Sequence, residues 1–433
     1  MVRDTLFRRT RCKGGTEMDR QIRASLFDIK LRTRTQMLIP LAVLAAIFLL
    51  IPTAHGQTFS VVHTFTGGGD GAQPFAGLTF DRAGNLYGTT HSGGNNGGGT
   101  VFKMTAKGST WLITPLHEFS PQGRGGANPS SGVIFGPDGS LYGTATTGGS
   151  GFGTVYKLQP PQNACKTTIC YWTQTVLYSF AGGTDGNQPT GNLFFDPAGN
   201  IYGTTQAGGT FDYGTVFQLT KSGGNWTESV LYSFASGQDG NGPTDGVIMN
   251  SAGNLFGTTP YGGINNCQGG CGTVYELTPS GSGWTEQIIY RFQGKPDAQR
   301  AYGGLILDSA GNLYGASYEG GENGGGTAYE LSPAGGSWNY AVIYNLTGSE
   351  NGPYARLAMD SSGNLYGTTL TPSTIFELSP ASGSWDYTDL HDLSGNDGDL
   401  PRGSVAIDSD GNLYGTTSAG GADQAGTAWK LTP

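Results

Sequence analysis

Short stretches rich in apolar, β-branched and aromatic residues follow one another along most of the chain. In residues 77–81 (GLTFD) apolar and polar side chains alternate, which is the period of a half-buried β-strand. Residues 86–90 (LYGTT), 99–104 (GTVFKM) and 111–119 (WLITPLHEF) are further strand-like stretches. Between the first two, residues 81–85 (DRAGN) contain the Asp and Gly that favour a tight hairpin turn. The pattern predicts four consecutive antiparallel strands.

This order of segments recurs along the chain. Its most regular element, GNLYGTT, occurs seven times with small variations, at intervals of 48 to 60 residues. The aromatic positions of the element are Tyr87, Tyr142, Tyr202, Phe256, Tyr314, Tyr366 and Tyr414. A repeat of this length, rich in strand residues and glycine, predicts a β-propeller with one four-stranded blade per repeat. We expect the aromatic residues to form the core between blades, and Gly88 and its equivalents to let a neighbouring blade approach closely.

The two ends of the repeat region complement each other. Residues 58–65 (TFSVVHTF) resemble a fourth strand such as 173–180 (TQTVLYSF), whereas residues 426–431 (GTAWKL) form a third strand that no fourth strand follows. We therefore expect an all-β, seven-bladed β-propeller of four-stranded antiparallel blades over residues 57–433. Strand 58–65 would complete the last blade and close the ring.

The first 56 residues differ from the rest. Residues 1–36 hold ten Lys and Arg against four acidic residues, and an apolar run, MLIPLAVLAAIFLLI, follows at 37–51. Fifteen residues are too few for a membrane-spanning helix, which needs about 20, and are typical of the hydrophobic region of a signal peptide. Small residues at Ala54 and Gly56 suit cleavage before Gln57. We predict a basic leader and signal peptide at 1–56 and a secreted or periplasmic protein, with an uncleaved anchor as the alternative.

Charge limits the partners of the remaining chain. Residues 57–433 carry a net charge of −15, since the whole chain carries −9 and the leader is basic. A body of this charge repels nucleic acid and anionic lipid. We expect no nucleic-acid partner, no membrane contact after signal cleavage, and a monomer.

Four cysteines outside the leader form two close pairs, Cys165 with Cys170 and Cys267 with Cys271. An even number of cysteines in an exported chain predicts two local disulfides, each bracing a loop. A metal site made by all four thiolates is the alternative. It is disfavoured because we place the two pairs on opposite faces of the ring.

Acidic loops precede several first strands. Asp-Gly pairs begin at Asp70, Asp185, Asp239 and Asp397, and Asp297 and Glu350 occupy the same place in the looser repeats. The same face would carry the glycine-rich loops between second and third strands, one of which holds His91. These residues are candidates for binding a cation such as Ca²⁺, or a glycan or peptide. The alternative is that each Asp caps its own loop.

Patterns typical of catalysis are scarce. No three histidines share an evident metal site, no serine nucleophile motif stands at a strand-to-helix turn, and no Gly-Lys-Ser/Thr follows the glycine runs. We assign no catalytic residue and no cofactor apart from possible Ca²⁺. The sequence favours an exported, non-catalytic binding or scaffold propeller for an extracellular glycan or protein ligand. A secreted hydrolase or lyase acting on polysaccharide is the alternative.

The linked elements GNLYGTTxxGG, GTVFxL, WxExVLYSF and DGxxP recur in this order over residues 57–433. Together they are similar to the Gloeo/Verruco repeat of the choice-of-anchor tandem-repeat proteins, which are exported by bacteria. The resemblance implies an exported, propeller-like protein and no particular activity. The hairpin element alone also looks like blades of NHL and virginiamycin-lyase-like propellers. This short likeness implies little beyond the fold.

Overall fold

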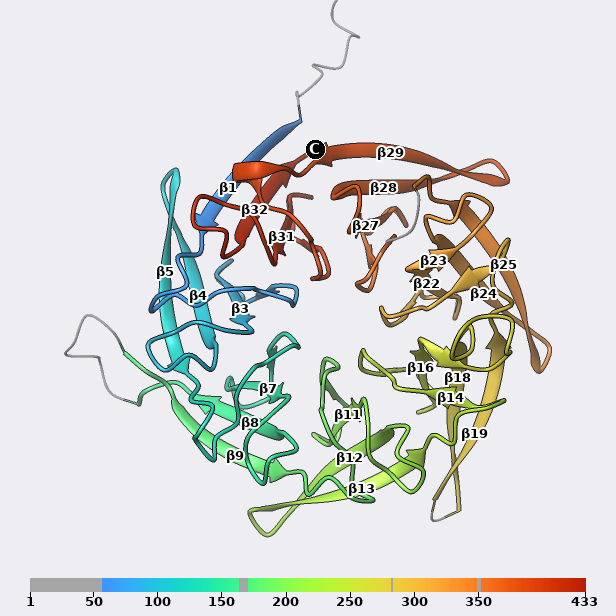
Figure 1. The fold of residues 1–433 in the computed structure, drawn as a ribbon, viewed down its shortest axis with the longest axis horizontal. Coiled ribbons are helices and arrows are strands. Elements are labelled where there is room, and N and C mark those ends of the chain that lie inside the picture. Colours follow the sequence, from blue (N-terminus) through green and yellow to red (C-terminus); the bar gives the residue numbers. More distant parts are fainter. Residues whose placement is uncertain (1–56, 163–169, 282, 349–351) are drawn as a thin grey trace, which may run out of the picture. The chain divides into compact units, whose positions relative to one another are not determined.

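Seven four-stranded antiparallel sheets stand around a common axis (Figure 1) in the part of the chain that the structure describes. The structure is a computed structural model, and the described residues are 57–162, 170–281, 283–348 and 352–433. The predicted signal peptide at 1–56 lies outside them. The sheets confirm the predicted seven-bladed propeller, and we number them blades 1 to 7 along the chain.

Each blade runs from a short strand near the axis to a long strand at the rim. The innermost strands have two residues each: β2 (Thr79–Phe80), β6 (Ile134–Phe135), β10 (Phe194–Phe195), β15 (Ile248–Met249), β21 (Ile306–Leu307), β26 (Ala358–Met359) and β30 (Ala406–Ile407). The second strands carry the LYGTT element: β3 (Leu86–Thr90), β7 (Leu141–Ala145), β11 (Ile201–Thr205), β16 (Leu255–Thr259), β22 (Leu313–Ser317), β27 (Leu365–Thr369) and β31 (Leu413–Thr417).

The third and fourth strands are longer. The third strands are β4 (Thr100–Lys107), β8 (Thr154–Gln159), β12 (Thr215–Ser222), β18 (Thr273–Ser280), β24 (Thr327–Ala334), β28 (Thr374–Ala381) and β32 (Thr427–Thr432). The rim strands are β5 (Thr110–Glu118), β9 (Thr173–Ser179), β13 (Asn225–Ser233), β19 (Gly283–Arg291), β25 (Ser337–Asn345), β29 (Ser384–Asp392) and, for blade 7, β1 (Thr58–Thr64).

Three minor elements brace loops on this framework. Two-stranded pairs join β14 (Gly240–Asn241) to β17 (Tyr261–Gly262) and β20 (Ala298–Gln299) to β23 (Glu319–Gly320). A single 3₁₀ turn, η1 (Gly395–Asp397), follows β29. Among the described residues, no helix has the length and apolar character needed to cross a bilayer.

The innermost strands are shorter than predicted. Residues 77–81 alternate like a strand, yet only Thr79 and Phe80 pair with β3. Just before them the chain leaves the sheet, because Gly77 packs against the backbone of Ser404 in blade 7. A Cβ on Gly77 would lie 2.6 Å from the Ser404 carbonyl oxygen. Contact around the axis therefore replaces further pairing.

The glycine of each second strand lies under an aromatic ring of its own blade. Gly88 pairs with Phe102 on β4, and a Cβ on Gly88 would lie 2.6 Å from Phe102 Cζ. The other pairs are Gly143–Tyr156, Gly203–Phe217, Gly257–Tyr275, Gly315–Tyr329, Gly367–Phe376 and Gly415–Trp429. The prediction that a neighbouring blade approaches this glycine directly was wrong, because the third-strand ring of the same sheet fills that space first.

That ring then reaches the preceding blade. Tyr156 of blade 2 packs edge-on against Phe119, the residue after β5 of blade 1, with 5.1 Å between centroids. Phe217 and Phe180 repeat the contact at 5.2 Å between blades 3 and 2. Among the described residues, the buried hydroxyl of Tyr156 has no hydrogen-bond partner. The position of this ring is therefore set by packing and not by a polar contact. Glycine, ring and the residue after the preceding rim strand thus form one continuous seam, and that residue is Phe at five boundaries and Leu346 or Leu393 at the other two.

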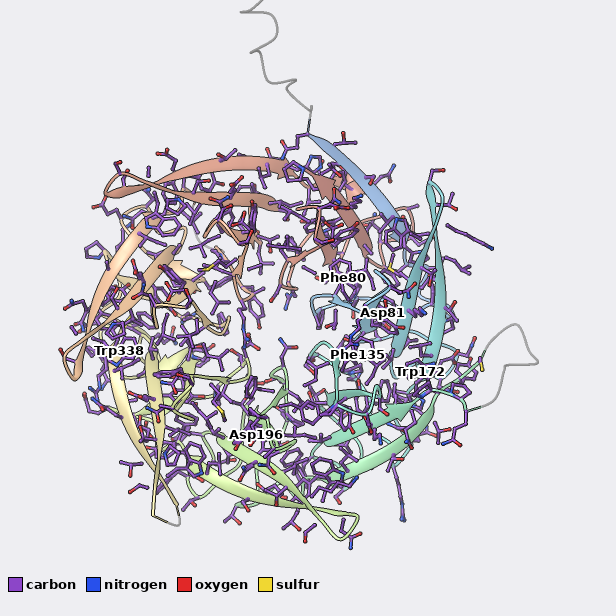
Figure 2. All side chains as sticks on the ribbon, turned by 180° about the vertical axis from the view of Figure 1, so that it is seen from behind. Phe80, Asp81, Phe135, Trp172, Asp196 and Trp338 are labelled. Carbon is purple, nitrogen blue, oxygen red and sulfur yellow. A yellow bond between two sulfur atoms is a disulfide. The ribbon has the colours of Figure 1, made fainter. Side chains whose placement is uncertain are left out.

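The aromatic residue of LYGTT lies at the opposite boundary, as predicted. Tyr87 packs against Phe135 and Trp172 of blade 2, with 5.1 and 6.2 Å between ring centroids. Figure 2 labels these two blade 2 residues and Asp81 of blade 1. The Tyr87 hydroxyl donates to Asp81 Oδ2 at 3.0 Å, and Asp81 also accepts from the turn that follows it. A bond from the tyrosine hydroxyl to an aspartate fixes the hairpin to its seam in every blade except blade 4.

Blade 4 differs at both the aspartate and the tyrosine of this hairpin. Phe256 replaces the tyrosine there, and Asn250 replaces the aspartate. Asn250 still accepts from the backbone of Ala252 and Asn254. Blade 4 thus lacks both the phenol and the carboxylate. In blade 2 Gly136 occupies the position of Asp81, and Asp138, two residues later, accepts from the Tyr142 hydroxyl at 3.1 Å.

The boundary between blades 7 and 1 uses the same contacts as the other boundaries. Strand β1 pairs antiparallel with β32 over Thr58–Thr64, which makes the N-terminal strand the rim of blade 7. Phe65 then packs against Phe102 of blade 1 at 5.2 Å, as Phe119 does against Tyr156. Tyr414 Oη lies in the equivalent hairpin, and its ring contacts Phe80 at 5.3 Å.

Removal of β1 tests whether this strand holds the ring together. A variant lacking residues 1–66 loses the β32 pairing and the fully buried Phe65. Compared with a variant lacking residues 1–56, we expect its melting temperature to fall by about 10 °C or more, since truncating one buried Phe alone costs about 3–5 kcal/mol. Equal melting temperatures in a calorimetric scan would contradict a closing role for β1.

A second prediction concerns the glycine under the ring. In Gly203→Ala the new Cβ would meet Phe217 Cζ at 2.5 Å, so the ring must shift and stability should fall by about 1–3 kcal/mol. The matched control is Gly183→Ala, because Gly183 has open space around its Cβ position. Urea unfolding should place Gly183→Ala within about 0.5 kcal/mol of the parent. A Gly203→Ala variant as stable as this control would refute the seam.

Candidate ligand-binding site

Seven short segments lead from the loops to the axis, just before the innermost strands. We call them the axial segments: residues 74–77, 129–132, 189–192, 243–246, 301–304, 353–356 and 401–404. Six of them begin with proline and the blade 5 segment begins with Ala301. They belong to the loops between fourth and first strands, the set that the sequence analysis selected.

A left-handed residue turns the chain into most axial segments. Gln73, Asn128, Gln188, Arg300 and Leu400 have φ between 55° and 57°. Gln73 shows why this costly conformation is kept. Its N–H donates to Ala425 of blade 7 at 2.8 Å, while its carbonyl accepts from His91 of its own blade at 3.0 Å. These hydrogen bonds tie the residue to two blades at once, and they offset the cost of its left-handed conformation.

These segments surround a cavity of about 220 Å³ to which all seven blades contribute. The side chain that follows the first segment residue lines it in every blade: Phe75, Ser130, Thr190, Thr244, Tyr302, Tyr354 and Arg402. Asn192, Asp245 and Arg356 add further polar groups. A concave site with apolar rings and a few placed polar groups is the usual form of a small-molecule pocket.

One side of the cavity is a continuous stack of side chains from four blades. The Arg402 guanidinium lies 5.1 Å from the Phe75 ring centre and 5.3 Å from that of Tyr354. Tyr354 stacks on Tyr302 at 4.8 Å with 20° between the planes. Beyond Phe75, His91 stacks at 4.6 Å. We call these five residues the stacked row. Because each member is held by its neighbours, the row is ordered before any ligand arrives.

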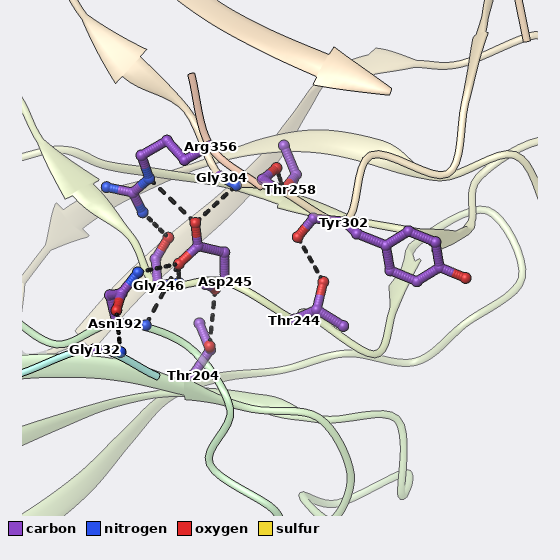
Figure 3. Close-up of polar contacts among 11 residues, drawn as sticks. Gly132, Asn192, Thr204, Thr244, Asp245, Gly246, Thr258, Tyr302, Gly304 and Arg356 are labelled. Atoms are coloured by element: carbon purple, nitrogen blue, oxygen red, sulfur yellow. Dashed lines mark hydrogen bonds and ion pairs between the residues drawn. The ribbon is translucent and has the colours of Figure 1, made fainter. Parts of the chain in front are cut away.

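A second part of the lining is held by a hydrogen-bond network centred on Asp245 (Figure 3). Its carboxylate accepts from Arg356 Nε at 3.1 Å and from the Gly304 N–H at 2.9 Å. Asn192 Nδ2 donates to it at 3.2 Å, and Asn192 Oδ1 accepts from the Gly132 N–H at 2.9 Å. The chain of contacts runs through blades 2 to 6.

Charge is distributed unevenly between these two parts of the lining. The Asp245 side chain is only 11% exposed, and although burial opposes ionisation, Arg356 and the backbone N–H groups hold its pKa below its usual value. Arg402 has no such partner: within the described residues it makes no hydrogen bond or ion pair, and its buried Nε lacks an acceptor. The cavity lining therefore carries one unpaired positive charge.

Thr190 and His91 are two further polar residues at the cavity. Thr190 lines the cavity, and its buried hydroxyl has no hydrogen-bond partner among the described residues. Burial lowers the pKa of His91, and the positive charge of Arg402 lowers it further. His91 is thus neutral at pH 7, with Nδ1 lying 3.2 Å from Ser130 Oγ. A neutral imidazole adds no charge to the stacked row.

The four predicted aspartates lie away from the cavity lining. Each accepts a hydrogen bond from the side chain near the end of the preceding rim strand: His63 to Asp70, Tyr178 to Asp185, Tyr232 to Asp239 and His391 to Asp397. Asp70, Asp185 and Asp239 also accept from their own loops, as Asp185 does from Ala181 N at 2.8 Å. Loop capping accounts for these contacts, and ligand binding by the aspartates stays a prediction.

The structure does not gather these carboxylates. Among the described residues, no group of three or more His, Cys, Asp or Glu side chains is close enough to hold a metal ion. Glu350 lies outside the described residues. Binding of Ca²⁺ by a single Asp-Gly loop stays a prediction.

The predicted Cys267–Cys271 disulfide is confirmed, and Cys165 of the other pair lies outside the described residues. The Cys271 carbonyl accepts from the Arg300 N–H at 2.9 Å. Since Arg300 immediately precedes the axial segment of blade 5, the stapled loop helps to position Tyr302.

Sequence reasoning missed most of the cavity residues. It named His91, which stacks on the cavity residue Phe75, but chose the Asp-Gly pairs ahead of the residues after the prolines. A signal was available, because the position after Pro74, Pro189, Pro243 and Pro401 is Phe, Thr, Thr and Arg. A variable position beside a repeated proline is where repeats of one fold differ in function.

Comparison with known proteins places the chain in a family. The profile of the Gloeobacter/Verrucomicrobia repeat matches residues 46–176, 172–270 and 265–433. No curated protein matches the chain.

Solved structures share the propeller fold at low identity. A structure described as a 6-phosphogluconolactonase from Bacteroides uniformis is 15% identical, with a TM-score of 0.50, and covers 78% of this chain and 88% of its own. A fungal alcohol oxidase with copper is 14% identical, with a TM-score of 0.51, covering 87% and 76%. A structure described as a glucose dehydrogenase from Thermus thermophilus is 16% identical, with a TM-score of 0.45, covering 87% and 100%. These likenesses concern the fold alone.

Two rim glutamates beside the predicted aspartates generate a pH prediction. Burial, followed by the charge of Asp185, raises the pKa of Glu228 to about 7, and burial with Asp239 does the same for Glu286. Each proton is held more tightly in the folded protein than in the unfolded chain, so stability should fall as the pH rises from about 4 through 7.

The double variant Glu228→Gln/Glu286→Gln should therefore melt several degrees above the parent at pH 8, and the difference should nearly vanish at pH 4. The control is Glu322→Gln, a change at an exposed glutamate, which should shift neither value. Scanning fluorimetry across this range suffices. A pH-independent difference would contradict the raised pKa values.

Proposed function

This chain belongs to the Gloeobacter/Verrucomicrobia repeat family, and on that premise we propose that it is an exported, non-catalytic propeller that binds an extracellular carbohydrate in its axial cavity. The observation that carries the proposal is the cavity itself. All seven blades line it, and two buried polar atoms there, Arg402 Nε and Thr190 Oγ1, have no partner among the described residues. Polar atoms without a partner beside a cavity favour a polar ligand.

The mixture of groups favours a sugar over an apolar ligand. A sugar ring has apolar C–H faces and a rim of hydroxyls, so it needs both aromatic surface and hydrogen-bonding side chains. Tyr302, Tyr354 and Phe75 supply the first, and Thr190 with Asn192 supply the second. The volume of about 220 Å³ suits a monosaccharide unit at the end of a chain.

Rigidity supports affinity. The stacked row is fixed by ring contacts and the second part of the lining by the Asp245 network, so little side-chain freedom is lost on binding. Export is part of the proposal and rests on the apolar run at 37–51, supported by the Cys267–Cys271 disulfide, which suits an oxidising compartment.

The hydroxyl of Thr190 offers a conservative test. We expect a screen of neutral and acidic sugars by ligand-observed NMR to find binders, and Thr190→Val to weaken the best of them about fivefold, as loss of one hydrogen bond predicts. The matched control is Thr175→Val on the exposed face of β9, which should bind like the parent. If no sugar binds, or if peptides bind instead, carbohydrate binding is refuted.

The same samples separate binding from the alternative of a hydrolase or lyase. A binding propeller returns oligosaccharides unchanged after long incubation. Accumulation of shorter products, abolished in a variant of one cavity residue, would establish the enzyme instead.

A further inference from the structure

Arg402 differs from the other arginines near the axis. Arg356 pairs with Asp245, and Arg300 pairs with Glu319 at 2.8 Å. Among the described residues Arg402 has ring contacts alone, to Phe75 and Tyr354. The rings interact with the faces of its guanidinium plane and leave its N–H donors, which point outward in that plane, without an acceptor.

Holding a guanidinium in this way has a cost. A buried donor without a partner loses the hydration it had in the unfolded chain, and in Arg402 this applies to the buried Nε. Cation–π attraction to the two flanking rings offsets part of this desolvation cost. They also fix the plane, so that an incoming anion meets donors already in position. A planar, always charged fork is the group that proteins use for bidentate contacts to carboxylate.

The surroundings strengthen the selection for an anion. The cavity lining contains one carboxylate, Asp245, and two guanidiniums, so its net charge is positive. Residues 57–433 as a whole are strongly acidic, with a net charge of −15. A single positive site in an acidic body attracts an anionic group to that point, while the remaining surface disfavours anions elsewhere.

We propose that the carbohydrate bound in the axial cavity is an acidic sugar, and that its anionic group, a carboxylate or a sulfate, pairs with Arg402. This inference rests on the proposed function and specifies its ligand class. The hydroxyls of the same sugar then meet Thr190 and Asn192 in the cavity. No bond of the ligand is made or broken.

The test compares three sugars that share one stereochemistry: D-galacturonate, D-galactose 6-sulfate and neutral D-galactose. Isothermal titration of the parent protein should show an acidic sugar binding about 10- to 100-fold more tightly than galactose, the range expected for a charge-assisted hydrogen bond. The sugar that shows the larger ratio identifies carboxylate or sulfate as the natural group.

Variants test whether Arg402 causes the preference for acidic sugars. Arg402→Gln should bring the ratio close to one while binding of galactose changes less than about threefold. Arg402→Lys should keep part of the ratio, because it retains the charge and loses the planar fork. The control is Arg82→Gln in an exposed hairpin, which should keep the full ratio.

The outcomes separate this inference from the proposed function. If galactose and both acidic sugars bind the parent equally, or if Arg402→Gln keeps the preference, the pairing with Arg402 is wrong while carbohydrate binding stands. If none of the three sugars, nor glucose with glucuronate, binds the parent, both are overturned. The comparison within the parent alone decides the anion preference even if a variant fails to fold.

Discussion

An aromatic ring packed over a glycine is the contact on which the rest of the molecule depends. In every blade the ring comes from the third strand, the glycine from the second, and the ring is almost wholly buried. Because glycine has no side chain, a ring as large as Trp429 lies flat against the sheet and still reaches the preceding blade. Seven such contacts set how closely the blades stand, and this spacing brings the axial segments into contact around the cavity.

The repeat therefore divides into two parts with different tasks. The hairpin, the glycine and the rings are almost the same in all blades because all seven boundaries have the same geometry. The axial segments share a backbone path, held by left-handed residues such as Gln73, but their side chains differ. A ring of identical side chains would surround the axis with sevenfold symmetry. The differences create the stacked row and the Asp245 network as two chemically distinct parts of the lining, so the cavity is not sevenfold symmetric.

The sequence predicted the fold and did not reveal the axial cavity, for physical reasons. The hairpin at Asp81–Tyr87 is local: its turn residues, its carboxylate and its phenol lie within seven positions, so pattern and spacing reveal it. The cavity is not local, since Phe75 and Arg402 touch only because the ring closes and brings the two ends of the chain together. Gln73 carried no signal either, because glutamine is not a residue that the left-handed conformation favours. The Asp-Gly pairs attracted attention as a repeated charge, and their partners turned out to lie within their own loops.

If the side chains that vary between repeats at the axis recognise the ligand, a crystal of the protein soaked with galacturonate will show where it binds. We expect ordered density in the cavity between Arg402 and Thr190, with the carboxylate within hydrogen-bond distance of the guanidinium. Density for the sugar at the Asp70, Asp185 or Asp239 loops, with the cavity unoccupied by it, would show that the axial side chains do not recognise the ligand.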